Sequence, residues 1–563
     1  LGKYNPAFQQ YLKASSEGRL CKSVPHAIWG AALAYHLFWR CQRDPESWKA
    51  FSLPVHGHHS RLHDDGELAL RIETFLGSHP EALTIMRKAL GDLPKPKVFA
   101  PPKGRSPYSR DMAIRMVFSA VVDADFLNTE KFFDRIQNAQ RRKWPNVGSL
   151  WQAMQAGESK LDREAHDPNS SVNQVRRDVR RACLAAATSE ATMFRLTVPT
   201  GGGKTRSALA FALKRAAEIP QQNAAPRRVI VALPYTSIID QTAGVYRKLL
   251  GNSAVLEHHS QAEARDGEEQ TDAACRARLA CENWDAPVVV TTTVQLFESL
   301  FANRPGKTRK LHNLARSVMI LDEVQALPPE LLRPILSAVR TLAEEYGVTV
   351  VLSTATQPAF EETEFLSEFH GLRVEEIVPD YARHFSRLQR VTYDIRPQPL
   401  SWKEIAADLR ADTLGGPKQA MVVLNSRKDA LLLLDMLAGV PDVFHLSTLL
   451  CGAHRKAILK EIRSRLDLRT PRPVRLVTTQ VVEAGVDLDF PTVWRAMAPM
   501  DRIVQAAGRC NREGRRPIEE SKVVVFEPAE GRAPQGPYRL GMEKARQLLA
   551  GNDGSALHDS HLH

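Results

Sequence analysis

A glycine-rich turn between an apolar segment and a helix-like one constrains this chain more than any other feature. Residues 198–205 read VPTGGGKT; they follow the apolar segment 194–198 and precede the helix-like run 207–213. Glycines let backbone N–H groups turn toward an anion, while the Lys and Thr that follow can reach the terminal phosphates and a Mg²⁺ ion. The run predicts a nucleoside-triphosphate loop, although Val198 stands where the pattern usually has Gly or Ala. The residues predicted to bind ATP and Mg²⁺ here are Pro199, Thr200, Gly201, Gly202, Gly203, Lys204 and Thr205.

A second apolar segment ends in two carboxylates, as the other half of such a site requires. Residues 318–321 read VMIL and precede Asp322 and Glu323. A short apolar run of this kind is typical of a buried parallel strand. At its carboxyl end, Asp322 would hold Mg²⁺ through water, and Glu323 would orient or deprotonate the attacking water.

Later segments favour a motor over a simple ATPase. Residues 350–356 (VVLSTAT) predict a strand whose terminal hydroxyls can sense the γ-phosphate, and residues 478–487 (TTQVVEAGVD) fit a strand-to-loop switch. Arg509 and Arg512 are three positions apart; on a helix they would share one face and point at a triphosphate bound across a cleft. The alternative for both arginines is exposed surface. We assign catalytic roles to Lys204, Asp322, Glu323, Gln505, Arg509 and Arg512, and a nucleotide-binding role to Asp487.

The order and spacing of these segments resemble superfamily 2 helicases, with motif I at 199–205, II at 322–325, III at 353–356, V at 478–487 and VI at 505–512. Closer detail resembles the CRISPR-associated helicase–nucleases of type I interference systems over nearly the whole chain. The stretches that carry this resemblance are LTVPTGGGKT (196–205), LPYTSIIDQTA (233–243), LEHHS (256–260), LDEVQALPP (321–329), STATQP (353–358) and GRCNREG (508–514). A DEVQ box stands where many relatives have DEVH, and it leaves the ATPase interpretation intact.

Composition agrees with this resemblance. The net charge of +12 and the pI near 9.4 favour a polyanionic partner. The seven cysteines include no CxxC pair, so they indicate reduced thiols and neither a disulfide framework nor a zinc site. There is no apolar run of membrane-spanning length and no signal-peptide pattern, so we expect a soluble cytoplasmic protein without a membrane partner.

The predicted fold is multidomain. Residues 1–150 read as an all-α domain, which the resemblance makes an HD-type nuclease; residues 151–190 read as a linker (157–171) and a basic helix (172–187). Short apolar strands alternating with helices then predict two RecA-like α/β domains with parallel sheets, at 191–390 and 391–535, followed by the start of a C-terminal region at 536–563. The predicted strands are 229–233, 288–292, 318–321 and 349–353 in the first domain and 420–424, 443–446, 474–478 and 522–526 in the second.

A histidine-rich stretch in the N-terminal region suggests a second chemistry. Residues 55–60 (VHGHHS) crowd three imidazoles together, and Asp123 and Asp125 offer carboxylates. Mixed His and Asp ligands suit Mn, Fe, Co, Ni or Zn better than Ca, although such a loop alone is more often solvated surface. The resemblance to HD-type nucleases implies a site for Mn²⁺, Co²⁺, Ni²⁺ or Fe²⁺, with Asp123 as a substitute for Asp125. The ligands it implies are His26, His58, His59 and Asp125.

The resemblance also implies a function. ATP would lie between the two α/β domains and drive 3′ to 5′ movement on single-stranded DNA, and a monomer would be recruited to an R-loop opened by a guide-RNA surveillance complex. Strand-end polar groups at 235–237, 291–293, 425–427 and 478–479 are candidate DNA contacts. The alternatives are a superfamily 2 RNA helicase whose helical N-terminal domain is not catalytic, and an ATP-gated clamp without stimulated turnover.

The first residues depart from the family pattern. Relatives read HD-x-G-K-x-x-x-x-F-Q where this chain begins LGKYNPAFQ, so their signature His-Asp pair would precede Leu1. A C-terminal accessory domain would likewise follow His563. On this reading we expect the chain as written to hydrolyse ATP but to cut DNA poorly, and restoring His-Asp ahead of Leu1 to recover cutting.

Overall fold

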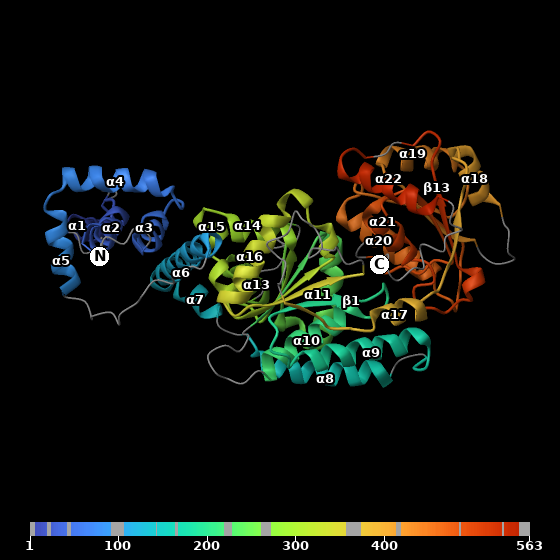
Figure 1. Cartoon of the computed structure of the whole chain (residues 1–563), viewed down its shortest axis with the longest axis horizontal. Coiled ribbons are helices and arrows are strands. Elements are labelled where there is room, and N and C mark those ends of the chain that lie inside the picture. Colours follow the sequence, from blue (N-terminus) through green and yellow to red (C-terminus); the bar gives the residue numbers. More distant parts are fainter. Residues whose placement is uncertain are drawn as a thin grey trace.

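The computed structural model of the chain describes residues 6–19, 24–41, 47–91, 106–141, 144–163, 167–218, 228–260, 272–355, 373–411, 418–483, 486–531 and 534–550. A helical N-terminal region is followed by two α/β domains, the first central and the second at the right of Figure 1. Within the described residues, no helix is both long and apolar enough to cross a lipid bilayer.

The described part of the N-terminal region is helical throughout. Its core is formed by Leu33, Leu68, Ile72 and Met86, all buried. Local signals set the helix starts: the carboxylate of Asp64 accepts from the backbone N–H groups of residues 66 and 67, and Ser106 caps a helix whose first residue is proline. The elements are α1 (Pro6–Ser16), α2 (Ala27–Tyr35), the π-helical turn η2 (His36–Cys41), α3 (Ser47–Gly57), α4 (Asp65–Ser78), α5 (Ala82–Gly91), α6 (Pro107–Phe133) and α7 (Arg135–Gln140).

Two helices under the first α/β domain correct the predicted linker. The stretch 157–171 is helical as far as Arg163, because α8 (Val147–Arg163) packs its buried Met154 into the core of that domain and lays Gly157 against Leu249. The basic helix is confirmed as α9 (Ser171–Ala186), which buries Val172, Val175, Val179 and Cys183. Both helices lie along the lower face of the first domain in Figure 1. Most of this segment therefore belongs to the packed first α/β domain.

The first α/β domain is a seven-stranded parallel sheet in the order β3-β4-β2-β5-β6-β1-β7, with one apolar core on each face. Strands buried on both faces explain the continuous apolar runs of the sequence. Its strands are β1 (Met193–Thr197), β2 (Arg228–Leu233), β3 (Val255–His258), β4 (Val288–Thr292), β5 (Ser317–Asp322), β6 (Thr349–Thr354) and β7 (Val374–Glu376). Its helices are α10 (Lys204–Glu218), α11 (Thr236–Leu250), α13 (Asp272–Asn283), α14 (Thr293–Phe301), α15 (Pro305–Thr308), α16 (Leu332–Glu345) and α17 (Tyr381–Arg387).

The second α/β domain has a six-stranded parallel sheet in the order β10-β11-β9-β12-β13-β8. Its strands are β8 (Thr392–Ile395), β9 (Gln419–Val423), β10 (Val443–Leu446), β11 (Val474–Thr478), β12 (Thr492–Ala496) and β13 (Lys522–Phe526). Its helices are α18 (Trp402–Arg410), α19 (Arg427–Met436), α20 (Gly452–Arg465), α21 (Met500–Ala507) and α22 (Pro537–Leu549). All eight predicted strands are confirmed, and α22 packs into the core of this domain through Met542, Ala545 and Leu549.

A buried network of charges joins the N-terminal region to the first α/β domain. Asp123 on α6 accepts from the Arg309 guanidinium at 2.7 Å and from the Asn283 side-chain amide at 3.2 Å. Glu282 bridges the same Arg309, at 2.9 Å, to Arg141, at 2.5 Å. Asp123 and Arg309 are both almost fully buried. The network therefore fixes α6 against the first α/β domain.

Breaking this network should lower stability measurably. We expect Asp123→Asn to reduce the free energy of unfolding by about 3 kcal/mol, the lower end for breaking a buried ion pair, because Glu282 still faces Arg309. Asp111→Asn is the matched control, since its pair with Arg115 on the same helix is half-exposed and should contribute less than about 1 kcal/mol. Urea unfolding followed by circular dichroism measures both variants, and equal midpoints would contradict this account.

Candidate ATP site and metal centre

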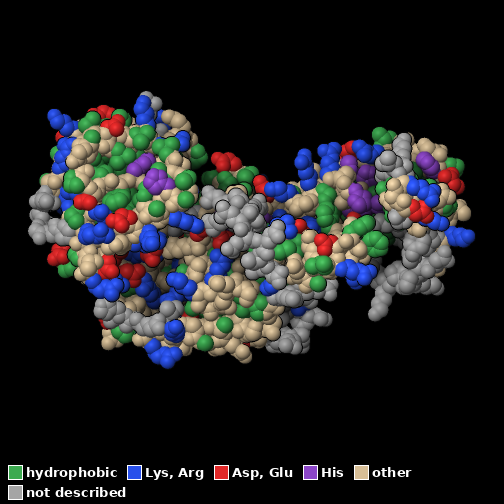
Figure 2. All heavy atoms as spheres, turned by 180° about the vertical axis from the view of Figure 1, so that it is seen from behind, with side chains coloured by type: hydrophobic (Ala, Val, Ile, Leu, Met, Phe, Trp, Pro, Cys, Tyr) green, Lys and Arg blue, Asp and Glu red, His purple; other side chains and the backbone are tan. Residues whose placement is uncertain are grey.

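A cleft of about 1020 Å³ lies between the two α/β domains, where the loop after β1 and the end of β5 face α21. Lys, Arg, Asp and Glu side chains gather along this boundary in the space-filling view (Figure 2). The cleft brings together every residue predicted to act on ATP except Gly202, and their roles remain predictions. Those lining it are Pro199, Thr200, Gly201, Gly203, Lys204, Thr205, Asp322, Glu323, Asp487, Gln505, Arg509 and Arg512.

The phosphate loop has the backbone that its glycines predict. Gly201 and Gly203 have φ of 83° and 87°, in the left-handed region where a side chain is strained. Gly202 lies beneath the loop, where an added Cβ would meet a Val198 methyl group at 2.6 Å. Helix α10 begins at Lys204, so its free N–H groups and positive dipole end face the cleft. The loop can therefore hold a polyphosphate.

Three charged side chains meet in the floor of the cleft. The Lys204 ammonium lies 3.3 Å from Glu323 Oε1 and 3.8 Å from Asp322 Oδ1. Burial disfavours the charge of Lys204, but Glu323 and Asp322 outweigh burial and raise the pKa of the ammonium. Burial also works against the charge of Glu323, yet Lys204 and a hydrogen bond from Gln325 hold its pKa below the ordinary value. Glu323 is thus a carboxylate able to accept a proton or orient water.

Asp322 has the opposite electrostatic bias. Burial prevails over the attraction of Lys204 and raises the pKa of Asp322. A divalent cation would reverse that bias, and the Thr205 hydroxyl at the start of α10 is a second oxygen donor on the same cleft. This donor set suits Mg²⁺, as predicted from the sequence.

The end of strand β6 holds the two acidic residues in place. The Ser353 hydroxyl donates to Asp322 Oδ1 at 2.8 Å, and the Thr354 hydroxyl donates to the side chain of Gln325. Gln325 in turn donates to Glu323. The predicted third member, Thr356, lies outside the described residues, as do residues 484–485 of the later motif. The hydroxyls at the end of β6 are therefore coupled to the carboxylates that would face the γ-phosphate.

The prediction that Arg509 and Arg512 share a helical face is wrong. Helix α21 ends at Ala507, because Gly508 packs on the phosphate loop, where an added Cβ would meet the Thr200 hydroxyl at 2.7 Å. Arg509 lies in the turn after the helix and donates to the carbonyls of Val482 and Glu483 at 2.9 and 2.7 Å. Both arginines still line the cleft.

Other groups of the second domain reach the same place. Gln505 on α21 donates to Glu323 Oε2 at 3.5 Å, across the domain boundary. Asp487 Oδ1 forms an ion pair with Arg512 Nε at 2.9 Å, so in this structure it holds an arginine on the cleft wall. Burial and the neighbouring Arg512 lower the pKa of Arg509 to about 9, and Arg509 therefore stays charged at neutral pH.

Two further arginines line or border the cleft and were missed. Arg176 on α9 donates to the carbonyl of Gly201 at 2.9 Å, and Arg390 donates to the carbonyl of Thr200 at 2.8 Å. The only sequence signal for Arg176 was the basic character of its helix. Arg390 lies between the two domains in the sequence and carried no signal at all.

Four of the candidate DNA contacts serve the fold. The hydroxyls of Thr291 and Thr478 are buried and donate to the carbonyls of His258 and Leu446. Thr292 caps α14, and Ser426 caps α19. Strand-end hydroxyls are often caps, so these four residues are removed as nucleic-acid contacts.

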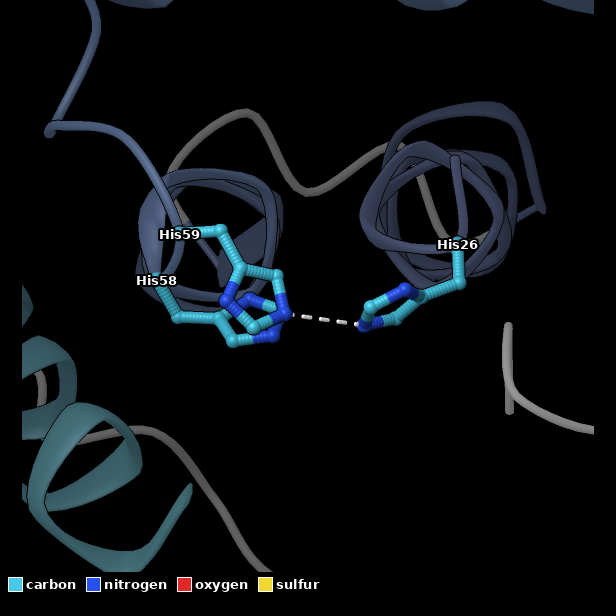
Figure 3. A group of neighbouring side chains, drawn as sticks. All are labelled: His26, His58 and His59. Atoms are coloured by element: carbon cyan, nitrogen blue, oxygen red, sulfur yellow. Dashed lines mark hydrogen bonds between the residues drawn. The ribbon is translucent and has the colours of Figure 1, made fainter. Parts of the chain in front are cut away.

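The N-terminal histidines form a compact group. Ring nitrogens of His26, His58 and His59 all lie within 4.8 Å of one another, and the three side chains point toward one another from two helix ends (Figure 3). His26 precedes α2, and the other two follow α3. His58 Nδ1 lies 2.6 Å from the carbonyl of Val55; donation by that nitrogen leaves Nε2 with a free lone pair. Such a second hydrogen bond is usual for a metal-binding imidazole, so the three rings fit a transition metal.

The two predicted aspartates differ in position. Asp125 Oδ2 lies 3.9 Å from His59 Nδ1, at the edge of the histidine group. Asp123 is bound to Arg309 and Asn283 inside the interface with the first α/β domain, and the prediction that it could replace Asp125 is wrong. Asp123 and Asp125 are two positions apart on α6, and residues two apart on a helix face different sides. This explains why only Asp125 lies beside the histidines.

Two family models match the α/β domains. The model described as DEAD/DEAH box helicase matches residues 177–364, and the one described as CRISPR-associated nuclease/helicase Cas3, C-terminal, matches residues 417–515. The curated CRISPR-associated nuclease/helicase Cas3 of Haloferax volcanii is 31% identical over 433 residues, which cover 60% of this chain and 46% of that protein. The chain thus spans less than half the length of this relative.

Solved structures share the fold. The T. fusca Cas3 structure with AMPPNP has a TM-score of 0.62 at 19% identity, covering 97% of this chain and 70% of that one. A chain in a structure described as a CRISPR RNA-guided surveillance complex, pre-nicking, has a TM-score of 0.57 at 19% identity, covering all of this chain and 72% of that one. Two parallel-sheet domains, the motif residues gathered between them and these matches show that the chain is a superfamily 2 helicase related to CRISPR-associated nuclease/helicase Cas3.

Proposed function

We propose that this chain hydrolyses ATP in response to single-stranded DNA and moves along that strand 3′ to 5′, and that its N-terminal region belongs to a metal-dependent HD-type nuclease that cuts the same strand. The observation that carries the motor half is the convergence of Lys204, Glu323, Gln505 and Arg509 on one cleft from two domains. Because both halves of the site come from one chain, a monomer suffices.

The geometry supports a role for each of these residues. Lys204 and the loop N–H groups bind the β- and γ-phosphates, and Glu323, 3.3 Å from Lys204, orients the attacking water. Mg²⁺, held through Asp322 and Thr205, would neutralise phosphate charge. Arg509 stabilises charge in the transition state, and Gln505 reports the state of Glu323 to the second domain.

The domain roles belong to the same proposal. Residues 1–150 form the nuclease, 191–390 and 391–535 the two motor domains, and 536–563 the start of a C-terminal region. His26, His58 and His59, with Asp125 at 3.9 Å from His59, would hold Mn²⁺, Co²⁺, Ni²⁺ or Fe²⁺. Such a metal supplies an activated water and stabilises the leaving oxygen.

The proposed setting is type I CRISPR interference, in which a guide-RNA surveillance complex at an R-loop recruits the chain to degrade target DNA. The relatedness to Cas3 and the shared fold with a chain of a surveillance-complex structure support this setting. The net charge of +12 suits a polyanionic substrate.

One set of assays tests the proposal. ATP turnover is measured with no nucleic acid, with single-stranded DNA and with single-stranded RNA, and cleavage of single-stranded DNA is measured with Mn²⁺ or Ni²⁺. We expect DNA to stimulate turnover. Stimulation by RNA alone without cleavage would instead support the RNA helicase, and ATP binding without stimulated turnover would support a clamp.

The histidine group gives a separate prediction. We expect His58→Gln to weaken binding of Ni²⁺ to the full chain by more than about a hundredfold, since even changes to groups behind the ligands cost about 10–100-fold. His63→Gln is the control, because His63 faces His56 and stands outside the group. Competition with a chelating dye measures affinity, and DNA-stimulated ATP turnover checks that both variants fold. Equal affinity in the two variants would contradict the assignment.

A further inference from the structure

Two carbonyl groups of the phosphate loop are bound by arginines that lie outside the helicase motifs. Arg390 Nη2 donates to the carbonyl of Thr200 at 2.8 Å, and Arg176 Nε donates to the carbonyl of Gly201 at 2.9 Å. Hydrogen bonds from a charged donor are stronger than neutral ones. The two carbonyls that open the loop are therefore fixed from outside it.

The same two arginines also bind the second domain. Arg390 Nη1 donates to the carbonyl of Arg512, and Arg176 Nη2 lies 3.2 Å from the carboxylate of Glu513. The side-chain amide of Asn511 returns a hydrogen bond to the carbonyl of Arg390 at 3.0 Å. Each guanidinium thus spans the boundary between the phosphate loop and residues 512 and 513, which lie three and four positions after Arg509.

Glycines make room for these bridges. A Cβ at Gly201 would lie 2.8 Å from Arg390 Nη1, and a Cβ at Gly203 would lie 3.2 Å from the side chain of Arg176. Contacts as short as 2.8 Å essentially never occur for a real Cβ atom. The glycines of the loop therefore serve the arginines as well as the backbone conformation.

The electrostatic setting keeps the bridges charged but leaves them poorly compensated. Burial, Arg512 and Arg176 lower the pKa of Arg390 to about 10, so it remains a cation at neutral pH. Glu513 and Asp489 partly offset the positive charge. A triphosphate in the cleft would add the negative charge that this group of arginines lacks.

We propose that Arg390 and Arg176 are positioning residues. They hold the phosphate loop and the segment 509–513 in a fixed relative position, so that ATP binding closes the two α/β domains in a productive arrangement. This role rests on the ATPase proposed above. Neither side chain needs to touch the phosphates, because each acts through a carbonyl of the loop on one side and through residues 512 and 513 on the other.

Arg387 provides a matched control. It is the last residue of α17, three positions before Arg390, and it binds α9 through Asp178 at 3.0 Å and Gln174 at 2.7 Å. Both partners lie on α9, which packs on the first α/β domain. Arg387 therefore makes similar bonds without bridging to residues 509–514. Arg387→Gln therefore removes an arginine of the same segment and leaves the bridges in place.

The first readout is the kinetic split. We expect Arg390→Gln to lower kcat for DNA-stimulated ATP turnover by about ten- to a hundredfold, as for loss of one charge-assisted hydrogen bond felt in the transition state. Binding of a fluorescent ATP analogue should change far less, and Arg387→Gln should leave both values near wild type. Arg390→Lys should stay impaired, because an ammonium keeps the charge but lacks the fork that spans two carbonyls. Full recovery with lysine would overturn the bridging role.

The second readout does not depend on turnover. Hydrogen exchange of residues 508–514 is measured in the full chain with and without a non-hydrolysable ATP analogue. In wild type and Arg387→Gln the analogue should slow exchange there, and in Arg390→Gln it should not. If wild type shows this protection but no ATPase, the proposed function fails while the coupling stands. Equal protection in Arg390→Gln would overturn the coupling.

A second variant guards against misfolding. Glu513→Gln breaks the Arg176 arm at a partly exposed side chain and should lower kcat in the same direction, by roughly three- to tenfold for one weakened hydrogen bond. Unchanged kcat in this variant, with Arg390→Gln unfolded, would overturn the proposal.

Discussion

Lys204→Ala and Glu323→Gln should each remove DNA-stimulated ATP hydrolysis and leave the fold intact. The Lys204 ammonium lies 3.3 Å from Glu323 and 3.8 Å from Asp322. It therefore balances the charge of two buried carboxylates and is placed to bind the phosphates. We expect losses on the order of 10²–10³-fold for removing the cation that stabilises charge, and about 10²–10⁴-fold for removing the base.

The two variants differ in their side effects. Lys204→Ala removes the cation nearest to Asp322 and Glu323, so it should also weaken ATP binding, whereas Glu323→Gln preserves shape and hydrogen bonding. Lys214→Ala on the same helix is the control, since Lys214 donates to the carbonyl of Leu184 away from the cleft. ATP turnover and thermal unfolding are measured together. Wild-type turnover in either active-site variant would contradict the assignment of the site.

The strands that sequence analysis predicted stand out as short apolar runs, and most of them are buried in their sheets. Strand β12 was missed because Arg495 interrupts its apolar pattern. The structure buries Arg495 completely and pairs it with the equally buried Glu483 at 2.7 Å, with Asn425 and Tyr538 as further partners. A buried charge of this kind depends on a partner distant in sequence, and local pattern gives no sign of it.

The end of α21 was mispredicted for a related reason. Residues 505–512 are compatible with a continuing helix, but contact of Gly508 with Thr200 stops it, and Asn511 takes a φ of 45°. The position of Arg509 in its motif predicted that it reaches the cleft. The backbone conformation that brings it there depends on contact with the first α/β domain. Local propensity is routinely overridden by such contacts.

The metal group shows which of its members could be predicted from local sequence. The crowding of residues 55–60 pointed to His58 and His59, and the structure places His26 3.1 Å from His59 although they are 33 positions apart. The choice between Asp123 and Asp125 needed the helix direction and the position of Arg309, which the sequence does not provide.

Arg509→Ala should lower ATP turnover on the order of 10³-fold while ATP affinity falls far less, because an arginine finger acts on charge that develops in the transition state. The structure supports this separation. Arg509 lines the cleft while its guanidinium donates to the carbonyls of Val482 and Glu483, so the fold positions it independently of the groups that bind the phosphates.

The measurement therefore compares kcat with the affinity for a fluorescent ATP analogue in wild type and Arg509→Ala. Arg539→Ala is the control for loss of an arginine elsewhere, because Arg539 forms an exposed ion pair with Glu543 on α22. Thermal unfolding is included because two buried carbonyls lose their donor in Arg509→Ala. If affinity falls by as much as kcat, Arg509 binds the ground state, and Arg512, held on the cleft wall by Asp487 at 2.9 Å, becomes the residue to test as the finger.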